Sequence, residues 1–422
     1  MSAVVLFGSF LVLLMLSVPI GYAIGISSLV GIYYFSDIPL EIIAQKSITG
    51  VDSFPLLAIP FFMLAGNLMS SGGIAKRLVN FFDSLIGHVT GGLGIVTVIV
   101  CMFFAAISGS AVATVSAVGA FMIPEMVEHG YDKKFSAALT AAAGTIGVII
   151  PPSIPFVIYG VTSGTSITDL FTAGFLPGVM MGIALILVCW MVSKKNGYKG
   201  RGKRSSLKEI GKSFRDAVWA ILSPVIILGG IYSGIFTPTE AAVVSVVYSF
   251  IVGVFVYKEL DPKGGYKAFK DAVVVNGATT FMVGFSSVFA AFLTMAQIPN
   301  MIAEGITSIT DNKFLILLII NLFLLVVGMF VDNIPATIIL TPILLPICTA
   351  VGMDAVTFGI MLTMNLAIGF CSPPYGINLF VASSISKVSI EDLTRNIIKP
   401  LIGLLIVLLL ITYVPYFTTL FI

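Results

Sequence analysis

Long stretches without any ionisable side chain constrain this chain most. Residues 92–124 contain no Asp, Glu, Lys, Arg or His, and neither do residues 135–168. Each stretch is much longer than the roughly 18 residues that mark a membrane-spanning helix, and neither shows the ten-residue segments of a transmembrane β-barrel. Only 10% of the 422 residues are charged, against roughly 25% in a soluble domain. The sequence therefore predicts an all-α polytopic membrane protein and argues against a water-soluble enzyme.

The few charged side chains and the four cysteines exclude further classes. The formal net charge is +2, and the basic residues stand in connecting segments without interleaved aromatics, so we expect no nucleic-acid partner. The four cysteines occur singly in apolar segments, where we interpret them as buried hydrophobic residues instead of disulfides or metal ligands. The apolar N-terminal stretch has no preceding Lys or Arg, so we interpret it as a retained helix and not as a signal peptide.

The apolar stretches are interrupted by one strongly basic segment. Residues 193–216 hold nine basic residues against Glu209 and Asp216, which predicts a cytoplasmic linker. Several apolar stretches are too long for one span and carry Gly, Pro or Ser in their middles. The predicted stretches are 3–35, 53–71, 92–128, 134–163, 171–193, 217–236, 240–257, 274–295, 313–350, 355–386 and 398–422.

An internal repeat relates the parts of the chain on either side of this linker. IGVIIPPS at 146–153 corresponds to IGFCSPPY at 368–375, and ITDL at 167–170 corresponds to IEDL at 390–393. In the same register, AISGSAVAT at 106–114 lies opposite MFVDNIPAT at 329–337. Pro177 likewise corresponds to Pro400. These four matches within one residue of a common shift predict two repeats, 1–195 and 217–422.

Counting spans outward from the linker gives the two repeats opposite orientations. The stretch 92–128 enters and leaves from the cytoplasm as a re-entrant hairpin, because the loop before it carries Lys76 and Arg77 and the one after it Lys133 and Lys134. The loop 258–271, with four lysines, is again inside, so 313–350 becomes a hairpin that enters from the outside. The first 35 residues form either one tilted span or two short ones, and the second repeat favours two.

Inverted repeats with paired broken helices are typical of a secondary transporter whose binding site lies at the repeat interface. We expect a scaffold of the spans 3–71 and 217–295 and transport elements at 92–163 and 313–386. An ion channel explains the four matched interruptions less well. The sequence has no Walker A motif for ATP, and no HExxH or GxSxG motif for an intramembrane enzyme.

The two hairpin breaks carry candidate ion ligands. Ser108 and Ser110 flank a glycine in the first break, and their hydroxyls suit a hard cation such as Na⁺, although small residues also serve close helix packing. Asp332 in the second break is the single acidic residue between Lys313 and Asp354, and an ionisable group in a membrane segment predicts a functional role. A helix cap beside Pro335 is the structural alternative for Asp332, and the two roles are compatible.

The other two breaks contain consecutive prolines, at 151–152 and 373–374. Prolines remove amide donors and free the preceding carbonyls, which can bind a cation, while the next half-helix points its positive N-terminus at an anion. A structural kink is the alternative. All five arginines fall in predicted loops, so a carboxylate would be held by helix dipoles, amides and hydroxyls instead of an Arg clamp. For Asn67 and Asn365, hydrogen-bonded packing explains the residue as well as ligation does.

Several motifs resemble one transporter family. The runs GIFTPTEAA at 234–242, SGSAVAT at 108–114, GVIIPPSIPFVIYG at 147–160 and CSPPYGINLF at 371–380 resemble the large membrane subunit of tripartite ATP-independent periplasmic (TRAP) transporters. The resemblance covers nearly the whole chain. It implies an elevator-type, Na⁺-driven carrier in the bacterial inner membrane. It also implies an organic-acid anion such as a C4-dicarboxylate, keto acid or sialic acid, delivered by a soluble periplasmic binding protein.

The resemblance also implies partners and site residues. Fused members carry about 150 further residues for a small four-helix membrane subunit, so we expect that subunit as a separate chain. A stand-alone sodium/anion symporter of the same architecture is the alternative. Each hairpin tip would face one unwound stretch and form a Na⁺ site, with the substrate between the two. The implied sodium ligands are Ser108, Ser110, Thr114, Gly147, Asp332, Asn333, Thr337 and Gly369, and the implied anion site comprises Pro151, Pro152, Ser153, Ser372, Pro373, Pro374 and Asn378.

Overall fold

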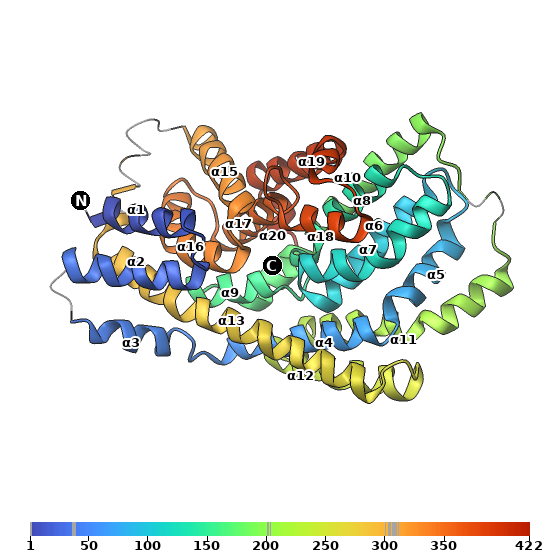
Figure 1. Cartoon of the computed structure of the whole chain (residues 1–422), viewed down its shortest axis with the longest axis horizontal. Coiled ribbons are helices and arrows are strands. Elements are labelled where there is room, and N and C mark those ends of the chain that lie inside the picture. Colours follow the sequence, from blue (N-terminus) through green and yellow to red (C-terminus); the bar gives the residue numbers. More distant parts are fainter. Residues whose placement is uncertain are drawn as a thin grey trace.

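The described part of the chain is helical throughout. A computed structural model describes residues 2–35, 39–200, 202, 204–299, 301–302, 305, 310 and 312–422, and no strand occurs among them (Figure 1). Arg201 and Lys203 of the predicted linker lie outside the described residues. Nine described helical segments are long and apolar enough to cross a membrane. The prediction of an all-α polytopic membrane protein is therefore confirmed.

The helices divide into two series. The first contains α1 Ser2–Met15, α2 Ile20–Phe35, α3 Glu41–Thr49, the 3-10 turn η1 Phe54–Leu57, α4 Ala58–Ser71, α5 Ile74–Ile86, α6 Gly92–Ser108, α7 Ala111–Glu128, α8 Lys133–Gly144, the 3-10 turn η2 Thr145–Val148, α9 Ile154–Ser163 and α10 Ile167–Asn196. The second contains α11 Leu207–Tyr232, α12 Pro238–Ile251, the π-helical turn η3 Val252–Val256, α13 Pro262–Met295, α15 Lys313–Phe330, α16 Asn333–Ala350, α17 Ala355–Gly369, α18 Ile377–Ser386, α19 Ile390–Tyr413 and α20 Tyr416–Thr419.

Both predicted hairpins and both predicted broken helices are present. The hairpins are α6–α7 and α15–α16, and the broken helices are α8–η2–α9 and α17–α18. Corresponding elements have matching lengths: α7 and α16 have 18 residues each, and α9 and α18 have 10 each. The starts of α9 and α18, at residues 154 and 377, also keep the repeat shift found in the sequence.

The two repeats interlock through these elements. Hairpin helix α7 packs on α8 of its own repeat and on α18 of the other, and α16 packs in the same way on α17 and on α9. Two hydrogen bonds join the broken helix of one repeat to that of the other: Tyr159 Oη donates to the Ala355 carbonyl at 2.6 Å, and Asn378 Nδ2 donates to the Ala141 carbonyl at 3.1 Å. Each half-helix after a break is thus held by the opposite hairpin.

A second group of helices runs lengthwise along one side of the molecule. Helices α3, α4, α12 and α13 lie along the lower edge in Figure 1, where α4 packs on α12 and α13, and α2 and α3 pack on α13. The 34 residues of α13 make it about 51 Å long at 1.5 Å per residue. The assignment of this group as a scaffold remains a prediction.

Three segments expected as loops are helical, which corrects the hydropathy-based boundaries. Helix α5 occupies the expected loop around Lys76 and Arg77, because its apolar face, including Ile74 and Leu78, is buried. Helix α11 begins inside the expected linker, where Ser206 and Glu209 form a capping box. Helix α13 begins at Pro262, within the expected loop 258–271, after the N-cap residue Asp261. The first 35 residues form two helices, α1 and α2, as the second repeat favours.

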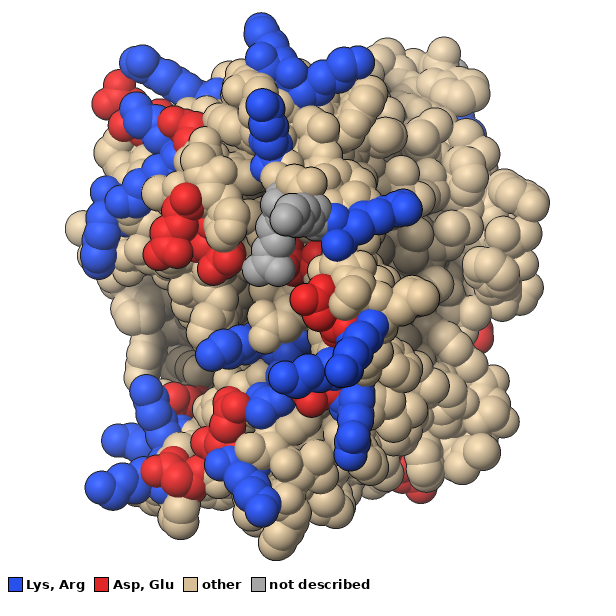
Figure 2. Space-filling model, turned by 90° about the vertical axis from the view of Figure 1, so that its right-hand side faces the viewer, with Lys and Arg blue, Asp and Glu red and all other residues tan. Residues whose placement is uncertain are grey.

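The basic segments expected in the cytoplasm gather at one end of the molecule. Figure 2 shows lysines and arginines concentrated on the end at which α5, α10 and α11 lie in Figure 1. Ion pairs connect these segments across the chain: Arg77 pairs with Glu259 at 2.7 Å, and Lys134 pairs with Asp392 at 2.9 Å. This arrangement agrees with the orientation derived from the positive-inside rule.

Close backbone packing of the second hairpin gives a stability prediction. A Cβ atom added to Gly328 of α15 would lie 2.8 Å from Leu366 Cα and 2.9 Å from its carbonyl oxygen. We therefore expect Gly328→Ala to destabilise the protein by about 1–3 kcal/mol through overpacking. Thermal unfolding of the detergent-purified protein measures this loss. Gly277→Ala is the matched control, because a Cβ atom there meets nothing within 4 Å; equal melting temperatures for the two variants would contradict the predicted packing.

Candidate functional site

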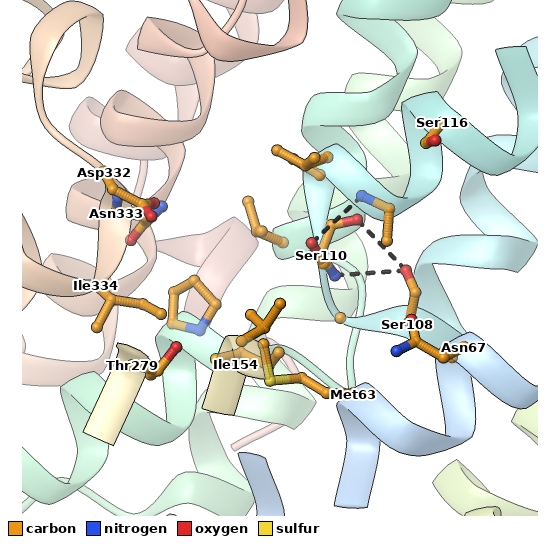
Figure 3. A pocket seen from close by; sticks show the side chains of 18 of the residues that line it. Met63, Asn67, Ser108, Ser110, Ser116, Ile154, Thr279, Asp332, Asn333 and Ile334 are labelled. Atoms are coloured by element: carbon orange, nitrogen blue, oxygen red, sulfur yellow. Dashed lines mark hydrogen bonds between the residues drawn. The ribbon is translucent and has the colours of Figure 1, made fainter. Parts of the chain in front are cut away.

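A cavity of about 620 Å³ separates the two hairpin tips. Ser108 and Ser110 of the first hairpin approach from one side, and Asp332 and Asn333 of the second approach from the other (Figure 3). Helices α4 and α13 close the cavity, together with residues next to the breaks in α8–η2–α9 and α17–α18. The cavity therefore lies where the two repeats meet.

The first hairpin tip gathers oxygen atoms around a small loop. The Thr114 hydroxyl donates to the Ser110 carbonyl at 2.8 Å and lies 3.2 Å from Ser108 Oγ. Gly147 of η2 stands against this cluster, because a Cβ atom added there would lie 2.6 Å from Thr114 Oγ1 and 2.7 Å from the Ser110 carbonyl. The structure thus brings four sequence-predicted sodium ligands together.

The first tip also closes onto the unwound stretch of its own repeat. Gly109 adopts a left-handed conformation with φ +60°, and a Cβ atom there would lie 2.8 Å from the Pro152 carbonyl. The Ile154 amide donates to the Gly109 carbonyl at 3.5 Å. Ser153 is buried, caps α9 and donates its hydroxyl to the Val148 carbonyl at 2.6 Å. A glycine at 109 is needed because only a residue without Cβ fits this approach.

The second hairpin tip is built around a carboxylate cap. Asp332 is the N-cap of α16 and accepts a hydrogen bond from the Asn333 amide at 2.6 Å. The Thr337 hydroxyl donates to Asn333 Oδ1 at 3.0 Å, which leaves Asn333 Nδ2 buried without a partner among the described residues. The free group of Asn333 is therefore a donor, which suits an anion better than a cation.

The second unwound stretch is held by its own backbone and side chains. The Ser372 hydroxyl donates to the Ile368 carbonyl at 2.8 Å, and the Asn378 amide donates to the Phe370 carbonyl at 2.9 Å. Asn378 Oδ1 is buried without a partner in the described part of the chain. Gly369 ends α17 and lies against Gly328 of α15, not against the tip residues of α16.

The predicted residues therefore fall into three groups. Ser108, Ser110, Asp332 and Asn333 line the cavity directly. Behind the tips, outside the lining, stand Thr114, Gly147, Thr337 and Gly369. The residues predicted for the anion also stand outside the lining, although their neighbours Val148, Ile154, Pro155 and Phe370 belong to it. These predicted residues are Pro151, Pro152, Ser153, Ser372, Pro373, Pro374 and Asn378. Ligand contact by these residues remains a prediction.

Helices α4 and α13 supply lining residues that the motif analysis missed. Gly66 and Asn67 of α4 face the first tip, and a Cβ atom on Gly66 would lie 3.1 Å from Ser108 Cα. Asn67 also donates a hydrogen bond from Nδ2 to the Ala268 carbonyl of α13 at 3.2 Å. This residue therefore both joins α4 to α13 and lines the cavity. Asp271 and Thr279 of α13 line the same cavity. Only the polarity of Asn67 within an apolar stretch gave a signal in the sequence.

Among the described residues, the cavity lining includes acidic side chains but no basic ones. Asp271 and Asp332 are its charged lining residues, and none of the described arginines reaches it. The N-terminal ends of α7, α9 and α16 all contribute to the lining, and helix N-termini attract negative charge. Within the described residues, no cluster of His, Cys, Asp and Glu fits a transition metal, and the four cysteines are buried and free. The arrangement suits an alkali cation and an anion together.

Comparisons with known proteins identify the family. Residues 7–417 match the family described as "Tripartite ATP-independent periplasmic transporter, DctM component". The chain is 46% identical over 412 residues to the isethionate TRAP transporter permease protein DctMQ of Oleidesulfovibrio alaskensis, covering 97% of this chain and 65% of that protein's length. It is 38% identical over 429 residues to the C4-dicarboxylate TRAP transporter large permease protein DctM of Rhodobacter capsulatus, covering 98% of this chain and 97% of that protein.

A solved structure supports the fold independently. The YdaH transporter of Alcanivorax borkumensis superimposes with a TM-score of 0.64 at 13% sequence identity, covering 88% of each chain. At this identity the likeness concerns the fold alone. The chain is thus a multi-pass protein of the bacterial inner membrane, a transporter component and not an enzyme, and it belongs to the DctM family of tripartite ATP-independent periplasmic transporters.

Proposed function

We propose that this chain carries a small organic-acid anion into the cell in symport with Na⁺. One observation carries the proposal: the two hairpin tips face each other across a cavity that holds two carboxylates, three helix N-termini and no basic side chain. The names of the relatives refer to isethionate and to C4-dicarboxylates, which are a sulfonate and carboxylates. We therefore propose a carboxylate or sulfonate as substrate; a keto acid or sialic acid remains within this class.

The charge of the cavity supports coupling to a cation. An anion about 5 Å from an ionised Asp332 is repelled by roughly 3 kcal/mol at an effective dielectric constant near 20. Sodium ions at the tips remove this repulsion and order the loops. The oxygen cluster of Ser108, Ser110 and Thr114 offers the first site, and the tip at Asp332 offers the second. Anion binding then depends on prior Na⁺ binding, which is the thermodynamic basis of symport.

The interlocked repeats support an elevator movement. The two broken helices bond to each other through Tyr159 and Asn378, and each hairpin packs on the broken helix of the other repeat. The unit can therefore move without unpairing its backbone. Helices α4 and α13 contact this unit beside the cavity: α13 packs on α16, and Gly66 of α4 allows a close approach to Ser108. We propose that the hairpin unit slides along these two helices and exposes the cavity to either side.

We propose two protein partners. The relative named DctMQ is longer than this chain, which spans 65% of its length, and the family name specifies a tripartite, periplasmic system. A small four-helix membrane subunit and a soluble periplasmic binding protein complete the transporter in this proposal. The exposed outer surface of α11–α13, with side chains such as Phe250, Phe255 and Val274, offers apolar area for the small subunit or for lipid.

Uptake into proteoliposomes tests the function. The vesicles contain this chain with its small subunit, and labelled succinate, isethionate, a keto acid or sialic acid is presented by a candidate binding protein. We expect accumulation of one acid against its gradient, only with an inward Na⁺ gradient and only with the binding protein. Accumulation with Na⁺ but without the binding protein would favour the stand-alone symporter, and flux that merely equilibrates the acid would indicate a channel.

Substitutions at Asp332 distinguish Na⁺ binding by this residue from helix capping alone. Asn is as good an N-cap as Asp, so Asp332→Asn keeps the cap of α16 but removes the charge. We expect this variant to unfold at nearly the wild-type temperature without Na⁺, whereas Asp332→Ala loses about 1 kcal/mol of stability. Both variants should lose most of the Na⁺-dependent thermal stabilisation that the wild type shows. The same Na⁺ response in Asp332→Asn and wild type would limit Asp332 to capping.

A further inference from the structure

Three cavities follow one another along the same face of α13. The hairpin-tip cavity shares Thr279 with a neighbouring cavity of about 250 Å³. That cavity shares Val283 with a third one of about 340 Å³, which extends along α13 to Ser287 and Ala290. From Thr279 to Ser287 this row covers about 12 Å of helix. The row leads away from the basic end of the molecule shown in Figure 2, toward the end where α3 lies in Figure 1.

The third cavity contains a lysine. Lys46 of α3 lines it together with Thr49 of the same helix and Thr162 of α9. The α3 backbone is fixed there, because Gly284 of α13 allows the Ser47 carbonyl to approach closely: an added Cβ atom would lie 2.9 Å from that oxygen. The Lys46 side chain is half-buried and forms no ion pair or side-chain hydrogen bond within the described residues. Among the described residues, the lining of this cavity thus includes one lysine and no acidic side chain.

The surroundings make this ammonium group unusual. In the segments that the orientation places outside the cell, the basic residues are Lys46 and Lys313, whereas acidic residues are more numerous. Lys313 donates to the Gly352 carbonyl at 3.4 Å and lines none of the three cavities. A basic side chain in the last turn of a helix also interacts with the helix dipole, and Lys46 stands in the last turn of α3. The helix dipole accounts for a lysine at this end of α3. It does not account for the position of Lys46 in the lining of the third cavity.

We infer that the cavity around Lys46 is a second anion site, on the outward side, in which the ammonium group pairs with the acid group of the substrate. The inference rests on the proposed function, because it supplies the attraction that the acidic hairpin-tip cavity lacks. A carboxylate or sulfonate first meets Lys46 between α3 and α9. It then passes along α13 to the tips once Na⁺ has bound there. The chemistry requires one anionic group and no particular carbon skeleton.

A thiol probe measures this attraction directly. Thr162→Cys places a thiol in the cavity, and the four native cysteines are buried, so the unsubstituted protein supplies the background. Anionic and cationic methanethiosulfonate reagents are compared in rate. We expect Lys46 to favour the anionic reagent about tenfold. The preference should be lost in Thr162→Cys/Lys46→Gln and kept in Thr162→Cys/Lys46→Arg and Thr162→Cys/Lys313→Gln. Succinate or isethionate should slow the reaction only where residue 46 is basic.

Transport by the single variants completes the test. Lys46→Gln should lower the initial rate of uptake at subsaturating acid about tenfold, while Lys46→Arg and Lys313→Gln remain near wild type. An unchanged reagent preference or unchanged uptake in a folded Lys46→Gln protein would overturn the inference. Protection of the Thr162→Cys thiol by the acid-free binding protein, without protection by succinate or isethionate, would overturn it in favour of protein docking. Absence of Na⁺-dependent uptake by the wild type would reject the proposed function and leave the reagent result to decide on the anion site.

Discussion

The structure depends on satisfying backbone that leaves helical geometry at membrane depth. Every unpaired amide or carbonyl is costly in a membrane unless protein, water or an ion supplies a partner. At the first break, Ser153 bonds the Val148 carbonyl and Ile154 bonds the Gly109 carbonyl. At the second, the Asn378 amide bonds the Phe370 carbonyl. The Ile154 bond joins a hairpin tip to an unwound stretch, and Gly109, Val148 and Ile154 line the cavity. Bonds that make the first break tolerable therefore also position the wall of the cavity.

The same constraint shapes the electrostatics of the cavity. A helix that begins inside the membrane exposes amide groups, and here α7, α9 and α16 begin around one space. Ser110 and Asp332 cap two of these helices. The caps differ in an important way, because Ser110 is neutral whereas Asp332 brings a carboxylate. The two tips are therefore related in backbone but not in charge, and we propose that they do not bind Na⁺ equally.

The sequence predicted the interruptions well because each of them has a local cause. Each break is caused by residues that act on their neighbours: the consecutive prolines, the glycine at 109, and the cap formed at Asp332 beside Pro335. The internal repeat predicted each break a second time, independently. No local sequence pattern determines which residues of α4 and α13 line the cavity. Asp271 and Thr279 face the cavity because a distant hairpin packs beside α13, which no local pattern records. The residues predicted for the anion stand outside the cavity lining for a related reason: Ser153 and Ser372 use their hydroxyls to satisfy the broken backbone.

The two repeats differ in structure, and these differences allow the protein to treat the anion differently on the two sides of the membrane. The repeat shift aligns the unbroken helix α13 with the segment that forms α3, η1 and α4, where Pro55 interrupts the helix. An unbroken α13 provides a continuous wall, while the interruption lets α3 depart from α4 and place Lys46 of its last turn in the lining of the third cavity. The shift of 223 residues that relates α9 to α18 aligns Lys46 with Phe269, so α13 has no cation at the equivalent position. Ion gradients set the net direction of a symporter. The unequal repeats let the affinity for the anion differ between the two sides, strong where the substrate is captured and weak where it is released.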